Sequence, residues 1–148
     1  MFFGQYPRSL DPKGRLAVPA RFRDHLPNGS FVTIGQDDAL RIYPPEEWEL
    51  VTRDLRLSNT DDPQMRNLIR RLFSEAYQIE FDAQGRFIVP AHLRAAAGIE
   101  GSVVVTGANN VVEVWSTARW EQLRSDTPNF TTLANAVADR KQQLNPTS

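Results

Sequence analysis

Apolar residues recur along the chain with two periods, one typical of strands and one typical of helices. Leu16 and Val18 alternate with their neighbours as in a strand, and residues 31–34 and 39–43 read as the two arms of a hairpin. Between residues 65 and 73 the apolar positions instead follow the spacing of one helical face. The pattern therefore predicts an α+β, β-rich chain.

The same pattern occurs twice. At a shift of 71 positions, residues 10–23 fall on residues 81–94, and after a one-residue insertion the match resumes at a shift of 72. The identities of the first block are Asp11/Asp82, Gly14/Gly85, Arg15/Arg86, Val18/Val89, Pro19/Pro90, Ala20/Ala91 and Arg23/Arg94. A tandem duplication explains this best, with one repeat at residues 1–76 and the other at residues 77–148.

Each repeat is predicted to run strand, turn, strand, short helix, hairpin and helices. A unit of that size has a marginal core unless disulfides or a metal stabilise it. The chain has no cysteine. We therefore expect the two repeats to pack on each other as an intramolecular pseudo-dimer with flanking helices.

The segment Asp-x-x-Gly-Arg, at residues 11–15 and 82–86, carries the clearest local signal. An aspartate that begins a turn accepts hydrogen bonds from backbone N–H groups two or more residues later, and a glycine adopts the positive φ that the turn needs. A structural role therefore accounts for Asp11, Gly14, Asp82 and Gly85.

The arginines Arg15 and Arg86 are less easily explained, since a short or β-branched residue would serve equally well at the start of a strand. One interpretation is an ion pair with the neighbouring aspartate. Another is a guanidinium fork presented at a hairpin tip, which suits phosphate groups or the edge of guanine. The residues themselves leave both interpretations open.

Charge at first argues against a nucleic-acid partner, because 17 basic and 18 acidic residues give a net charge of −1. The charges are, however, sorted along the chain. Residues 37–62 carry eight acids and three arginines. Residues 8–23 carry one acid, Asp11, and five bases, namely Arg8, Lys13, Arg15, Arg21 and Arg23. A basic surface can therefore exist around the first turn, whereas the second turn is poorer in charge.

Enzymatic signals are weak. The sequence has no thiol, no phosphate-cradling loop, no dinucleotide fingerprint and no histidine pair with metal-ligand spacing. We therefore expect no catalytic activity, cofactor, metal or small-molecule substrate. No apolar run approaches the roughly 18 residues that span a membrane, and the absence of cysteine favours a reducing compartment, so a cytoplasmic location is expected.

The two blocks at residues 10–23 and 81–94, together with Val112-Glu-Val-Trp115, resemble the bacterial MraZ family over nearly the whole chain. That family consists of two tandem SpoVT/AbrB-like domains, which implies swapped-hairpin β units. The resemblance implies a cytoplasmic, nucleoid-associated transcriptional regulator of the division and cell-wall gene cluster. It also implies binding of double-stranded DNA at short direct promoter repeats, and assembly into a ring of identical subunits.

On this hypothesis Arg15 and Arg86 contact DNA from the two turns. The remaining candidate DNA contacts, directed to phosphates, are Lys13, Arg8, Arg21 and Arg23. One alternative is a ring-forming protein-interaction module in which the arginines make intersubunit ion pairs. A second is a hydrolase that uses carboxylates, which is disfavoured because the paired acids lie at a predicted loop and a predicted helix cap.

Overall fold

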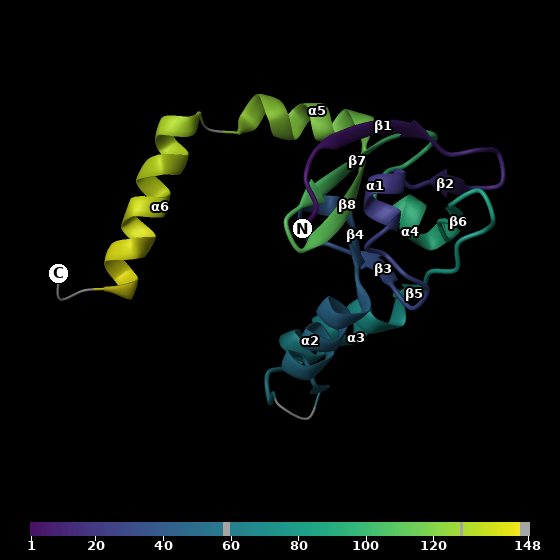
Figure 1. Cartoon of the computed structure of the whole chain (residues 1–148). Coiled ribbons are helices and arrows are strands. Elements are labelled where there is room, and N and C mark those ends of the chain that lie inside the picture. Colours follow the sequence, from purple (N-terminus) through teal and green to yellow (C-terminus); the bar gives the residue numbers. More distant parts are fainter. Residues whose placement is uncertain (58–59, 128, 146–148) are drawn as a thin grey trace. The chain divides into compact units, whose positions relative to one another are not determined.

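The computed structural model of the protein describes residues 1–57, 60–127 and 129–145. The chain divides into two compact units, Met1–Thr117 and Ala118–Ser148. All described strands and the helices α1 to α4 belong to the first unit, which is the larger one (Figure 1). The second unit holds α6 and nearly all of α5.

The strands are β1 (Gln5–Ser9), β2 (Arg15–Ala17), β3 (Phe31–Ile34), β4 (Leu40–Tyr43), β5 (Tyr77–Gln78), β6 (Arg86–Ile88), β7 (Ser102–Ala108) and β8 (Val111–Ser116). The α-helices are α1 (Ala20–Arg23), α2 (Pro45–Asp54), α3 (Pro63–Ser74), α4 (Ala91–Ala96), α5 (Thr117–Asp126) and α6 (Phe130–Leu144), and a 3-10 turn, η1, spans Gln36–Asp38.

The two repeats exchange strands. Six strands form an antiparallel sheet in the order β1-β7-β8-β4-β3-β5, and β2 pairs with β6 in a separate two-stranded ribbon. Thus β1 of the first repeat pairs with β7 of the second, and β5 of the second pairs with β3 of the first. The expected α+β fold of two packed repeats is confirmed, with strands of each repeat completing the other.

Equivalent residues of the two repeats meet at a local two-fold axis. Arg41 of β4 pairs with Glu113 of β8, its own repeat equivalent, and the Arg41 Nη2 lies 3.1 Å from the Glu113 Oε2. Leu16 of β2 pairs in the same way with its equivalent Phe87 of β6. The axis therefore passes through the middle of the sheet and through the middle of the ribbon.

Both repeats supply the core of the first unit. Matched pairs of buried side chains are Leu16 with Phe87, Val18 with Val89, and Phe22 with Leu93. Burial of each such side chain stabilises the fold by about 1.5–3 kcal/mol. Because these side chains of both repeats belong to one buried cluster, neither repeat has a separate core of its own.

Helices begin where the sequence places prolines and caps. Pro45 opens α2, and Asp62 caps α3 by accepting a hydrogen bond from the Gln64 backbone N–H. The ring of Trp48 in α2 stacks on Phe31 with centroids 4.7 Å apart and meets Phe73 of α3 at 5.3 Å. These contacts hold α2 and α3 against the β3 end of the sheet.

In the second unit, the Asn129 side chain caps α6 by accepting a hydrogen bond from the Thr132 backbone N–H. The helix extends to Leu144, beyond the apolar positions that predict it. In the part of the chain that the structure describes, no helix has the length and apolar character needed to cross a bilayer.

The compact units do not follow the repeats, because strands of the two repeats alternate within one sheet. The boundary between residues 76 and 77 is a property of the duplicated sequence and stays a prediction. Residues 146–148, assigned to the second repeat, lie outside the described residues.

Candidate nucleic-acid interface

The first Asp-x-x-Gly-Arg segment forms a closed turn before β2. The Gly14 N–H donates to the Asp11 carbonyl at 2.9 Å, and Gly14 has a φ of +80°. The Asp11 Oδ1 accepts hydrogen bonds from the backbone N–H groups of Lys13 and Arg15, both at 2.9 Å. One carboxylate oxygen therefore satisfies two donors that the turn would otherwise leave without a partner.

The second segment repeats this geometry before β6. The Gly85 N–H donates to the Asp82 carbonyl at 3.0 Å, and Gly85 has a φ of +75°. The Asp82 Oδ1 accepts from the backbone N–H groups of Gln84 and Arg86, both at 2.9 Å. The two turns are thus copies of each other in structure as well as in sequence.

Each aspartate also holds the arginine of its own turn. The Arg15 Nε donates to the Asp11 Oδ2, and the Arg86 Nε donates to the Asp82 Oδ2 at 2.9 Å. The Arg86 Nη1 further lies 3.9 Å from the Asp11 Oδ2, which links the two turns. Because the aspartate takes the Nε, the two η nitrogens are the donors left to face a ligand.

These contacts also shift the pKa values of the two aspartate carboxylates. The pKa of Asp11 is lowered, first by the hydrogen bond from the Arg15 backbone N–H and further by the Arg15 side chain. The pKa of Asp82 is lowered in the same way by Arg86. Both aspartates are therefore ionised at neutral pH, and they balance the charges of their arginines. The first turn keeps one surplus positive charge, on the exposed side chain of Lys13.

Arg23 and Arg94 lie across the turns of the opposite repeat. The Arg23 Nε donates to the Val18 carbonyl at 3.0 Å, and a Cβ added at Gly85 would lie 2.3 Å from the Arg23 Nη1. A Cβ at Gly14 would likewise lie 3.1 Å from the Arg94 Cζ. Each guanidinium therefore covers a glycine of the other repeat's turn.

Arg94 has no predicted role in the sequence analysis, although the repeat contains the signal for it. It is the equivalent of Arg23 at a shift of 71. Its Nε is buried, and within the described residues it has no hydrogen-bond partner. The structure therefore gives Arg94 a packing contact on the first turn, comparable to the contact of Arg23 on the second.

The other two basic candidates lie outside the ribbon. The Arg8 side chain in β1 donates to the Pro7 carbonyl and lies 5.8 Å from the ring centre of Tyr6. The exposed Arg21 in α1 lies 5.7 Å from the ring centre of Phe3. The ribbon thus gathers Lys13, Arg15, Arg23 and Arg86 near its turns, while Arg8 and Arg21 belong to neighbouring elements.

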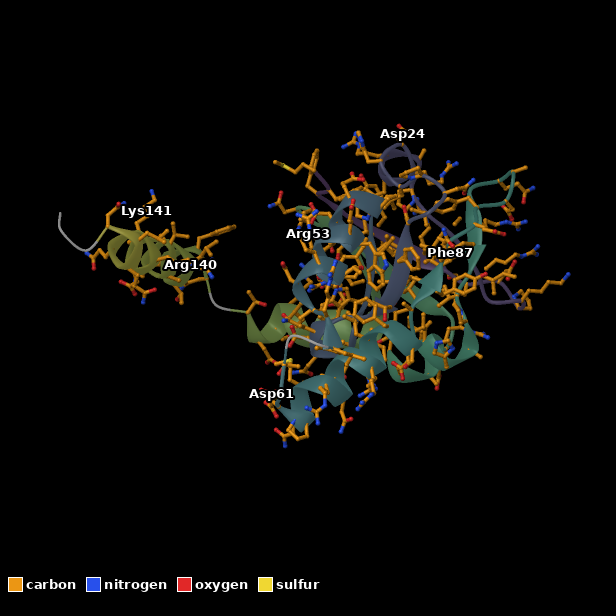
Figure 2. The ribbon with its side chains drawn as sticks, turned by 90° about the horizontal axis from the view of Figure 1, so that it is seen from below. Asp24, Arg53, Asp61, Phe87, Arg140 and Lys141 are labelled. Carbon is orange, nitrogen blue, oxygen red and sulfur yellow. The ribbon has the colours of Figure 1, made fainter. Side chains whose placement is uncertain are left out.

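The ribbon has one buried face and one open face. Leu16 and Phe87 point into the core, and the labelled Phe87 lies among the packed side chains of the first unit (Figure 2). The alternate positions Arg15, Ala17, Arg86 and Ile88 lie on the other face. The turns before β2 and β6 extend from the same side of this unit (Figure 1).

In the described ranges, no group of three or more His, Asp or Glu side chains is placed to hold a metal ion. The interface itself presents two guanidinium groups, of Arg15 and Arg86, held by aspartates on one β-ribbon. Guanidinium groups donate paired hydrogen bonds to anionic groups and to polar acceptor edges.

Fold and turns together define a class: a duplicated, strand-exchanged protein that presents two aspartate-held arginines on one ribbon. Residues 1–70 and 72–141 each match the family described as "MraZ protein, putative antitoxin-like". The chain therefore belongs to the MraZ family, as its resemblance predicted.

Relatives from several bacteria support this membership. A protein of Pediococcus pentosaceus is 41% identical over 94% of this chain and 98% of its own length. One of Heliobacterium modesticaldum is 40% identical over the same shares. One of Thermomicrobium roseum is 40% identical over 81% of this chain and 84% of its own. Each is named "Transcriptional regulator MraZ", and the family is one of transcriptional regulators and not of enzymes.

Proposed function

We propose that this protein is a sequence-specific, double-stranded DNA-binding regulator of transcription that acts in the cytoplasm, at the nucleoid. Its proposed sites are short direct repeats in a promoter of the division and cell-wall gene cluster, as the family resemblance implies. The observation that carries the proposal is the placement of Arg15 and Arg86 on one face of a single ribbon, each fixed through its Nε.

That geometry supports the direct reading of bases. The major groove of B-DNA is wide enough for a two-stranded β-ribbon, and an arginine recognises guanine by donating two hydrogen bonds to the O6 and N7 atoms. An arginine whose Nε is bound by an aspartate keeps its η nitrogens for such a fork. The fixed orientation also lowers the side-chain entropy lost on binding. We assign this role to Arg15 and Arg86.

Phosphate contacts are assigned to the basic residues around the ribbon. Lys13 belongs to the first turn, Arg8 to β1 and Arg21 to α1, and none of the three is a residue of β2 or β6. We assign these cations to the DNA backbone and not to its bases. Arg23 is assigned to phosphate as well, and its contact with Gly85 supports an additional role in positioning the second turn. The weaker charge around the second turn implies that binding depends more on the first.

We further propose that the chain assembles into a ring of identical subunits. In the first unit, α2, α3 and the β3–β4 hairpin surround a groove of about 510 Å³. Met65 and Leu68 of α3 line it and are exposed, at 40% and 61%. In the second unit, α6 carries Phe130, Leu133 and Val137 along one helical face. We assign α6 of another subunit as the occupant of the groove.

Assembly would compensate for the modest charge of each subunit. When several subunits of one ring meet several closely spaced repeats, each further contact forms at a high effective concentration. Weak binding by single subunits then becomes strong binding by the ring. This fits an overall charge of −1 better than a single high-affinity contact does.

The proposal is tested by footprinting the DNA upstream of this protein's own gene with the full-length protein. The expected result is protection of short, regularly spaced segments, with strength that falls as salt is raised. Uniform or absent protection across the fragment, at protein concentrations that saturate binding, would contradict sequence-specific recognition.

A further inference from the structure

Ile88 is an apolar side chain on the open face of the ribbon. It is 52% exposed, whereas the flanking Phe87 and Val89 are buried. In the register of the ribbon Ile88 pairs directly with Arg15, and Arg86 lies two residues earlier on the same face of its own strand. Ile88 is thus an exposed aliphatic group between the two arginines proposed to read DNA.

The position makes an apolar protein partner a poor occupant. A single isoleucine flanked by two guanidinium groups does not form an extended apolar patch, and a protein surface placed there would have to desolvate both charges. The major groove of DNA offers a better match. It is lined by phosphates and polar base edges, and the one apolar group that it presents is the C5-methyl of thymine.

We propose that Ile88 is a specificity-determining residue that contacts a thymine C5-methyl group in the major groove, beside the bases read by the arginines. This inference rests on the proposed function, because it requires the open face of the ribbon to enter the groove. A contact from Ile88 would add recognition of thymine, which the arginines cannot supply because a guanidinium fork recognises guanine and not thymine.

The contact would also give the ribbon a direction on DNA. The local two-fold axis places Ala17 at the position equivalent to Ile88, and the alanine methyl is too short to reach as far from the strand. The first turn carries Lys13 where the second carries Gln84. Because Arg15 pairs with Ile88, the extra cation and the larger aliphatic side chain lie at the same end of the ribbon, and the other end carries Gln84 and Ala17. Such an asymmetric reader suits sites repeated in one orientation and not palindromes.

The test replaces thymine by uracil, one position at a time, in the DNA segment protected in the footprint. Uracil keeps the base pair with adenine and removes only the methyl group. For the wild-type protein, affinity measured by fluorescence anisotropy should fall about four-fold at one thymine position of the repeat, which corresponds to loss of one buried methyl group. Ile88→Ala should bind the thymine and uracil versions of that position equally.

Two further variants make the result specific. Ile88→Val keeps the β-branched side chain and the strand propensity, so it should fold as the wild type does and show an intermediate uracil effect. Leu50→Ala removes an aliphatic side chain of similar exposure from α2, outside both the ribbon and the residues that line the groove, and should keep the full effect. The double-mutant cycle between protein and DNA isolates the contact.

The outcomes separate this inference from the proposed function. If wild-type protein fails to bind the thymine DNA, the proposed function fails. If it binds but no uracil position weakens binding, or if Ile88→Ala retains the effect at that position, the assignment of Ile88 is overturned and DNA binding stands. A change of native mass in Ile88→Ala with an unchanged uracil effect would also overturn it, because Ile88 would then pack against another subunit.

Discussion

At the scale of the residue, each turn depends on one carboxylate that accepts three hydrogen bonds. Asp11 and Asp82 each accept two backbone hydrogen bonds that close the turn and one from the arginine Nε that orients the guanidinium. The same group therefore serves the local fold and the proposed recognition of DNA. A substitution of the aspartate should therefore affect both the local fold and DNA recognition, whereas a substitution of the arginine should affect mainly DNA recognition.

The lowered pKa values of Asp11 and Asp82 predict a specific acid sensitivity. Both lie below the ordinary value of 3.8, so these carboxylates stabilise the fold fully above about pH 4 and lose that contribution as the pH falls toward their folded-state values. The double variant Asp11→Asn, Asp82→Asn should therefore show a flatter dependence of stability on pH below about pH 4.

Urea unfolding followed by circular dichroism between pH 6 and about pH 2.5 measures this dependence. Above pH 5 the wild type and the double variant should differ by a constant amount. Parallel curves through the acid range would mean that the two aspartates have the same pKa in the folded and unfolded chains.

Sequence alone predicts the turn residues but not all of their partners. The spacing of Asp11 and Gly14 is a local signal, because the contacts that they make lie within four residues. The packing of Arg23 on Gly85 and of Arg94 on Gly14 joins residues far apart in the chain. Such contacts depend on the exchange of strands between the repeats. No local sequence pattern predicts that each arginine packs on the turn of the opposite repeat and not on the turn of its own.

At the scale of the element, the fold depends on close approach between exchanged segments. The N-terminal segment crosses β7 at Gly107, whose backbone N–H donates to the Gly4 carbonyl at 2.9 Å. A Cβ at Gly107 would lie 2.2 Å from the Phe3 backbone nitrogen. The glycine is needed for this approach, because backbone atoms cannot move aside as a flexible side chain can.

Gly107→Ala should therefore destabilise the protein by about 2–3 kcal/mol, as forced overpacking does in a well-packed region. Gly101→Ala is the matched control, since a Cβ there meets no atom within 4 Å. That control should stay within about 0.5 kcal/mol of wild type. Chemical unfolding of the three proteins measures the difference, and equal stabilities would show that the N-terminal segment does not cross Gly107 closely in solution.

Element types were predictable from the sequence, but strand partners were not. Alternation in residues 31–34 and 39–43 predicts β3 and β4, and Asp62-Pro63 predicts the start of α3. The alternation of apolar and polar residues indicates which residues of a strand share a face, but it does not indicate which other strand will pair with it. The pairing of β4 with β8 and of β2 with β6 was therefore implied only by the repeat, since equivalent elements meet at a two-fold axis.

At the scale of the whole molecule, the net charge of −1 conceals an uneven distribution. Basic groups lie around the first turn, and acidic groups concentrate in residues 37–62, part of which lines the groove beside α3. Each subunit alone should bind DNA weakly and with strong dependence on salt. Assembly is what would convert that weak contact into regulation.

Assembly is predicted to depend on the apolar face of α6. Leu133→Asp places a charge on that face and should lower the native mass from a multiple of the 16.8 kDa chain. Asn135→Asp adds the same charge on the opposite face of the helix and should leave the mass unchanged. Native mass spectrometry distinguishes the two, and an unchanged mass in Leu133→Asp would contradict this interface.

The claim that the paired turns read DNA is tested most directly by titrating the footprinted fragment with Arg15→Ala, Arg86→Ala and Arg53→Ala. Arg53 is exposed on α2, and its replacement removes the same charge away from the ribbon. Loss of a fork to guanine should weaken binding by roughly 5- to 150-fold in each turn variant, while Arg53→Ala should stay within about two-fold. Wild-type affinity in both turn variants, with the fold intact, would contradict the account.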